Sequence, residues 1–153
     1  MISFKKLEDI LATTIEWEEQ MKDLYDVAEL GVNTKEANKL LLFLIESHSK
    51  HLNILSNLRI KDYGPDEWIN FTADFGVLRQ IPQHQITRES SAEEIFSKVR
   101  SYEEAMESLY KRVSEHTISE SQTELFLSLA LMKKNQISAI SNFMESYFNP
   151  NLG

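Results

Sequence analysis

The sequence predicts an all-α protein built as a bundle of four long helices, and three observations support this. Four Gly and three Pro among 153 residues are too few for the many turns of a β-rich fold. Apolar residues recur at spacings of three and four over four long stretches, which is the period of a helix with one buried face. The segment WEEQMKDLY at 17–25 recurs as YEEAMESLY at 102–110, 85 residues later. The repeat indicates two matching halves.

The first half is expected to form a helical hairpin over 4–58. A helix at 4–30 is followed by a tight turn, in which Gly31 takes the left-handed conformation that often ends a helix and Thr34 caps the next helix. The second helix, to about Leu58, must then run antiparallel to the first. Polar residues interrupt both apolar stripes, which read Leu7, Leu11, Thr14, Glu18, Met21, Tyr25 and Ala28, then Leu41, Leu44, His48, His51 and Leu55.

Residues 59–90 break this pattern and are expected to form a long crossover with a short amphipathic helix near 66–75. A second hairpin follows over 91–148. Ser91 begins its first helix, which ends near His116, and Ser119 or Ser121 caps the last helix before Pro150. The stripes of this hairpin read Phe96, Val99, Glu103, Met106, Tyr110 and Val113, then Phe126, Leu129, Lys133, Gln136, Ile140, Phe143 and Tyr147. We expect residues 1–153 to form a single domain.

Composition narrows the classes of function. The net charge of -8 disfavours nucleic acid and acidic membrane surfaces as partners. The chain has no Cys, which excludes disulfides, thiolate metal sites and thiol redox chemistry. Charges near the N-terminus interrupt any signal-peptide pattern, and no stretch reaches the ~20 apolar residues of a membrane span. We therefore expect a cytoplasmic protein.

Superposing the two halves aligns the polar residues of the stripes. Glu18 falls on Glu103 and Tyr25 on Tyr110, while His48 falls on Lys133 and His51 on Gln136. Each Glu precedes its Tyr by seven residues, two helical turns, so the pair shares a face. We expect the two Glu and the four polar residues of the other helices to meet inside the bundle. The two Tyr either fill the core, with their hydroxyls at polar neighbours, or donate hydrogen bonds to this site.

Two hairpins with a long crossover, and these polar positions, resemble the ferritin-like superfamily. The Glu-x6-Tyr pattern and LIESHSKHLNIL at 44–55 are most similar to its rubrerythrin branch. That resemblance implies an antiparallel four-helix bundle holding two irons, with one Glu from each of two helices and a Glu-x-x-His from each of the other two. Carried over by position, Glu18, Glu103 and His51 match the implied ligands. His48 and Lys133 stand at the positions of Glu, and Gln136 at that of His.

The substitutions predict a degenerate di-iron site. Glu18 and Glu103 carry two negative charges, Lys133 carries one positive charge, and a protonated His48 or His51 brings the sum to zero without metal. A charged lysine cannot ligate, and neighbouring carboxylates favour its charged form. We therefore expect a buried polar network and a non-catalytic structural or interaction protein, with no di-iron cofactor. The predicted network contains Glu18, Glu103, Lys133, Gln136, Tyr25 and Tyr110.

Two alternatives remain open at this point. The first is a metal-binding protein with one Fe, Zn or Ni ion held by Glu18, His48, His51 and Glu103, since two His three residues apart plus a carboxylate suit these metals. The second is a di-iron oxidoreductase that takes its electrons from a partner, as the resemblance alone implies. The resemblance also implies pairing of bundles side by side, so we expect a homodimer and consider a protein partner.

Overall fold

Four long helices dominate the computed structural model, which describes residues 4–64, 68–70 and 86–148. Within these ranges the α-helices are α1 (Leu7–Glu29), α2 (Lys35–Ser56), α3 (Ala92–His116) and α4 (Glu120–Phe148). A short 3-10 helix, η1 (Ile60–Tyr63), and two short strands, β1 (Phe4–Lys6) and β2 (Trp68–Asn70), complete the described elements. The prediction of a helical protein with four long helices is confirmed.

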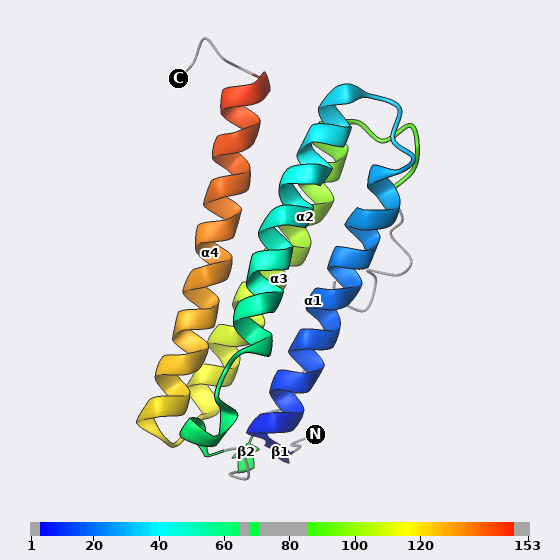
Figure 1. Ribbon diagram of the computed structural model, residues 1–153. Coiled ribbons are helices and arrows are strands. Elements are labelled where there is room, and N and C mark those ends of the chain that lie inside the picture. The colour runs from blue at the N-terminus through cyan, green and yellow to red at the C-terminus, as the bar shows by residue number, and fades with distance from the viewer. Residues whose placement is uncertain (1–3, 65–67, 71–85, 149–153) are drawn as a thin grey trace.

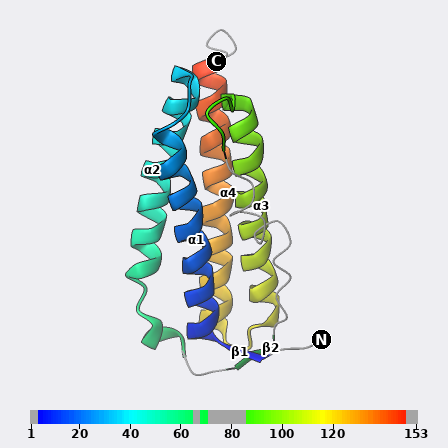
Figure 2. The ribbon, with the colours of Figure 1, turned by 90° about the vertical axis from the view of Figure 1, so that its right-hand side faces the viewer.

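The four helices lie side by side with their axes roughly aligned (Figures 1 and 2). In Figure 1, α1 and α4 run away from the end where β1 and β2 lie, whereas α2 and α3 run towards it. The most extensive packing is between α1 and α2 and between α3 and α4, and α2 also contacts both α3 and α4. Residues 59–90 therefore connect opposite ends of the bundle.

The buried face of each helix follows the predicted stripe. In α1 the buried residues are Leu7, Ile10, Leu11, Thr14, Glu18, Met21, Tyr25 and Ala28. In α3 they include Val99, Glu103, Met106, Tyr110 and Val113. The polar residues of these stripes are buried because they share one helix face with apolar residues that pack into the core. No helix in the described ranges is both long enough and apolar enough to cross a bilayer.

Side-chain caps start three of the helices. Thr34 accepts a hydrogen bond from the Ala37 N–H, and Ser91 accepts one from the Glu94 N–H. Ser119, rather than Ser121, accepts from the N–H of Gln122 at the start of α4. Each cap satisfies one of the free N–H groups of a first helical turn. The segments between α1 and α2 and between α3 and α4 are short.

The prediction for Gly31 was wrong. Among the described residues, Gly64, with a φ of 70°, is the glycine in the left-handed region, and it ends η1. The α1 helix instead ends with Leu30 in a right-handed conformation, and the N–H groups of Gly31 and Val32 both donate to the Ala28 carbonyl. These two bonds satisfy a carbonyl of the last turn without a change of handedness.

Two further predictions were wrong at the strand end of the bundle. Residues 4–6 form β1 instead of the first turn of α1, and residues 68–70 of the expected crossover helix form β2, antiparallel to β1. The other residues of that expected helix, 66–67 and 71–75, lie outside the described residues. Ile69 is buried, and the Lys6 ammonium lies 5.9 Å from the centre of the Trp68 ring. The pairing holds β2 beside β1, the segment directly before α1.

Candidate functional site

An ion network formed by one side chain from each helix lies in the middle of the bundle. Glu18 comes from α1, His48 from α2, Glu103 from α3 and Lys133 from α4, and all four are 0% exposed. The Lys133 Nζ donates to Glu18 Oε2 at 2.6 Å and to Glu103 Oε2 at 3.1 Å, and it also contacts Glu18 Oε1. Lys133 therefore bridges the two carboxylates that the repeat places symmetrically.

His48 bridges the same two carboxylates from the opposite half of the repeat. Its Nε2 lies 2.6 Å from Glu103 Oε1, within hydrogen-bond distance, whereas its Nδ1 lies 3.4 Å from Glu18 Oε2 and has no hydrogen-bond partner among the described residues. An ionised carboxylate can only accept a hydrogen bond, so the Nε2 carries a proton and its N–H donates a hydrogen bond to Glu103 Oε1. Both ring nitrogens face carboxylate oxygens. With two Glu anions and the Lys133 cation, an imidazolium at His48 would bring the four side chains to zero net charge.

The charges hold one another in their ionised forms. Burial alone would raise the pKa of Glu103, but the Lys133 ammonium and His48 outweigh it and lower that pKa to about 2. Burial likewise opposes the charge on Lys133, yet Glu103 and Glu18 raise the pKa of its ammonium above the usual value. Lys133 is therefore a buried cation and neither a nucleophile nor a ligand.

His51 and Gln136 lie beside this network and take no direct part in its ion pairs. The His51 ring centre lies 6.1 Å from that of His48, and its buried Nδ1 has no hydrogen-bond partner among the described residues. Burial, with the Lys133 charge, lowers the pKa of His51 to about 4, so His51 is neutral at pH 7. Gln136 is 5% exposed, and its Nε2 also lacks a partner there.

The two Tyr of the repeat differ in their hydrogen bonding. Tyr110 donates a long hydrogen bond of 3.4 Å to Glu18 Oε1. The Tyr25 hydroxyl has no hydrogen-bond partner among the described residues, and its ring packs edge-on against His48, with centres 5.1 Å apart. Burial and the nearby Glu anions raise the pKa of both hydroxyls, so both stay protonated. Tyr110 extends the network, whereas Tyr25 covers it.

The arrangement does not fit a di-iron centre. The oxygens of Glu18 and Glu103 that would bind metal are directed at the Lys133 ammonium, which carries the positive charge that a metal would otherwise supply. Among residues 4–64, 68–70 and 86–148, no group of three or more His, Asp or Glu side chains is arranged to hold a metal ion. A single ion bound by Glu18, His48, His51 and Glu103 would have to displace Lys133 from its two partners.

One polar contact outside the network was missed by the sequence analysis. Gln122 is 1% exposed, and its Nε2 donates to the carbonyls of Tyr63 at 2.7 Å and Gly64 at 3.0 Å. These two hydrogen bonds connect the end of η1 to the first turn of α4. The only sequence signal was a polar residue at a helical start, which is typical of exposed positions as well.

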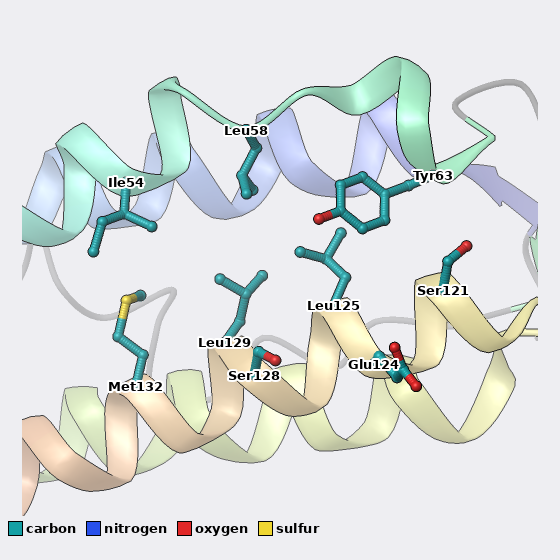
Figure 3. Close-up of a pocket in the computed structure, with 9 residues that line it drawn as sticks. All are labelled: Ile54, Leu58, Tyr63, Ser121, Glu124, Leu125, Ser128, Leu129 and Met132. Carbon is teal, nitrogen blue, oxygen red and sulfur yellow. The ribbon is translucent and has the colours of Figure 1, made fainter.

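A groove lies between the end of α2 with η1 and the first half of α4 (Figure 3). In Figure 3, Leu58 and Tyr63 extend from one wall towards Leu125 and Leu129 on the other. Its lining consists of Ile54, Leu58, Tyr63, Ser121, Glu124, Leu125, Ser128, Leu129 and Met132. Glu124 and Tyr63 are the two titratable side chains in this lining. The ion network is not part of it.

Comparisons with protein-family models, curated proteins and solved structures find no match to this chain.

Proposed function

We propose that this chain is a rubrerythrin-like member of the ferritin-like superfamily in which an internal ion network has replaced the di-iron site, and that its role is structural or in protein interaction. The observation that carries the proposal is the Lys133 ammonium, which contacts both Glu18 and Glu103 in the middle of the bundle. A fixed side-chain cation does the electrostatic work of a metal ion there but offers no open coordination position and no redox chemistry.

The helix directions also support this proposal. In the ferritin-like pattern, two antiparallel hairpins are joined by one long crossover. The short turns before Thr34 and Ser119, and a connection of residues 59–90 that joins opposite ends of the bundle, agree with that pattern (Figure 1). We infer the same assignment of helices, with Glu18 and Glu103 at the single-Glu positions and Lys133 at a lost Glu position.

Metal binding tests the proposal directly. We expect protein from metal-supplemented cells to hold no stoichiometric iron, zinc or nickel by elemental analysis, and calorimetry to detect no binding of these ions at micromolar affinity. It should consume no peroxide in the presence of iron. Stoichiometric metal that disappears in a His51→Ala variant would instead establish the single-ion site at Glu18, His48, His51 and Glu103.

Restoring the lost ligand types provides the converse test. The double variant Lys133→Glu/Gln136→His replaces the internal cation with a third carboxylate and adds a His one turn later. We expect this variant to gain ferrous iron binding, because three buried carboxylates require a cation. Lys50→Glu/Asn53→His is the matched control, since it also replaces a Lys by Glu and a side-chain amide by His at the same spacing, but on the exposed face of α2. If neither variant binds iron, the helix assignment is wrong.

A further inference from the structure

The first half of α4 is apolar around most of its circumference. Leu125, Phe126, Leu129 and Ala130 face the bundle and are buried, yet Leu127 is 49% exposed and Leu131 is 55% exposed. A helix that is apolar on all sides is normally covered on all sides. Figure 1 shows α4 at the edge of the bundle, beside α2 and α3, with one side not covered by another helix.

The exposed side of α4 carries a stripe of four residues: Glu124, Leu127, Leu131 and Lys134. All four are exposed, and their spacings of three, four and three place them along one line on the helix surface. This spacing is that of a coiled-coil seam. The stripe lies on the outside of the bundle, where Glu124 also borders the groove between α2 and α4, and the buried Lys133 lies on the other side of the same helix.

The order of these four residues makes the stripe complementary to itself. If two copies of α4 pack antiparallel about a twofold axis, Leu127 of each copy faces Leu131 of the other. In the same register, Glu124 of each copy faces Lys134 of the other, because both pairs share one midpoint along the helix. A twofold interface needs this reciprocity: if a residue of the first copy contacts a given residue of the second, the same two positions also meet with the copies exchanged. The charge pattern therefore selects the antiparallel orientation, since a parallel arrangement would place Glu124 against Glu124.

The neighbours of the stripe permit close approach. Ser128 and Asn135, beside the two leucines and Lys134, are exposed and have short side chains. Neither Glu124 nor Lys134 forms an ion pair with another described residue, so both are available to a second copy. The net charge of -8 opposes general self-association, which makes a contact that pairs Lys134 with a carboxylate the favoured one.

We propose that the Glu124–Lys134 stripe of α4 is a homodimerisation site, in which a second copy of this chain packs antiparallel across a twofold axis. The inference is independent of the function proposed for the buried network. One pair of helices forms a small interface, so the dimer should be of micromolar affinity and should dissociate on dilution.

Sedimentation equilibrium over a range of protein concentrations tests the site. We expect a monomer–dimer equilibrium in the wild type and, in a Leu127→Gln/Leu131→Gln variant, a dissociation constant raised by roughly tenfold or more. Leu30→Gln is the matched control, because Leu30 is 86% exposed at the other end of the bundle. A wild type that stays monomeric throughout, or a dimer unaffected by the two α4 changes, overturns the proposal.

Charge exchange tests the orientation. Glu124→Lys and Lys134→Glu should each weaken the dimer, by about tenfold or more, because each sets like charges opposite each other twice. An equimolar mixture of these two variants should form a heterodimer, since every opposing pair is then of opposite sign. The doubly exchanged chain should dimerise like the wild type, and Lys35→Glu on the far end of α2 should change nothing. Failure of the mixture to associate rules out the antiparallel register.

Discussion

Each half of the bundle buries one Glu carboxylate, but the two halves supply different side chains to contact these carboxylates. Glu18 in α1 and Glu103 in α3 are equivalent by the repeat, and both are fully buried. The first half supplies His48, whose ring nitrogens face both carboxylates, and the second half supplies Lys133, whose ammonium contacts both and has its pKa raised by them. Because the Lys133 ammonium contacts both carboxylates, we expect it to provide the larger share of their electrostatic stabilisation.

Removing Lys133 should therefore have the largest effect. In Lys133→Met the side chain stays unbranched and is one atom shorter. Glu18 and Glu103, both fully buried, lose the ammonium that they contact. We expect the free energy of unfolding to fall by about 3–5 kcal/mol, because a buried charge without its partner is strongly destabilising. Urea denaturation followed by circular dichroism measures the change.

The neighbouring lysine is the control for this change. Lys134 is exposed on the outer side of α4, so Lys134→Met should alter the unfolding free energy by no more than about 0.5 kcal/mol in dilute, monomeric protein. Equal effects at the two positions would contradict the assignment of Lys133 as the central cation.

Acid should weaken the fold through Glu103. The pKa of this carboxyl is about 2 in the folded protein against an ordinary value of 4.5, so Glu103 contributes stability that is complete above pH 4.5. That contribution is lost as the pH falls from 4.5 towards 2, and it is on the order of 3 kcal/mol. Denaturation curves at stepped pH should show this loss in the wild type but not in Glu103→Gln.

His51 should act in a higher pH window. Its pKa is about 4 in the folded protein and 6.5 ordinarily, so between pH 6.5 and 4 the unfolded chain binds a proton that the folded chain does not. Stability is therefore complete above pH 6.5 and falls as the pH drops towards 4. The loss is smaller than that from Glu103 because His51 is only partly buried. His51→Gln should remove the pH dependence of stability in this range. Glu103→Gln should retain it, because the Glu103 charge raises the His51 pKa and its loss keeps that pKa low.

The fold and the members of the network were predictable from the sequence to different degrees. Periodicity predicted the four helices and their buried faces, because a polar residue such as Glu18 is carried inside by Thr14 and Met21 one turn away. The choice of partners was less predictable. The role of His48 as a bridge between both carboxylates depends on its side-chain orientation, whereas His51, three residues later, lies only partly inside.

The strand pair shows why local pattern failed elsewhere. Trp68 and Ile69 were expected in an amphipathic helix, yet they form β2 because Phe4–Lys6, which lies 62 to 66 positions earlier in the chain, pairs with Trp68–Asn70. Such pairing between distant segments cannot be read from local periodicity. Gly31 failed for a similar reason: the N–H of Asn33, two residues later, bonds the Arg88 carbonyl at 2.9 Å, and that distant contact helps to define the turn.

A double-variant cycle measures the coupling within the network. Glu18→Gln removes one anion and leaves Lys133 with Glu103 and His48. Combined with Lys133→Met, it should cost less than the sum of the two single changes, because the double variant retains no unpaired carboxylate at position 18. We expect a coupling energy of about 1–3 kcal/mol from urea denaturation. Additive effects would show that Glu18 and Lys133 do not stabilise each other.

The two Tyr of the repeat give the smallest and most selective comparison. Tyr110→Phe removes the hydroxyl that donates to Glu18, and we expect a loss of about 0.5–1.5 kcal/mol, at the lower end because the bond is 3.4 Å long. Tyr25→Phe removes a buried hydroxyl without a hydrogen-bond partner among the described residues, so it should be neutral or slightly stabilising. Thermal unfolding of the two variants side by side measures the difference. Opposite signs would show that the repeat preserves the position of the ring but not the function of its hydroxyl, and equal losses would mean that Tyr25 also donates to the buried network.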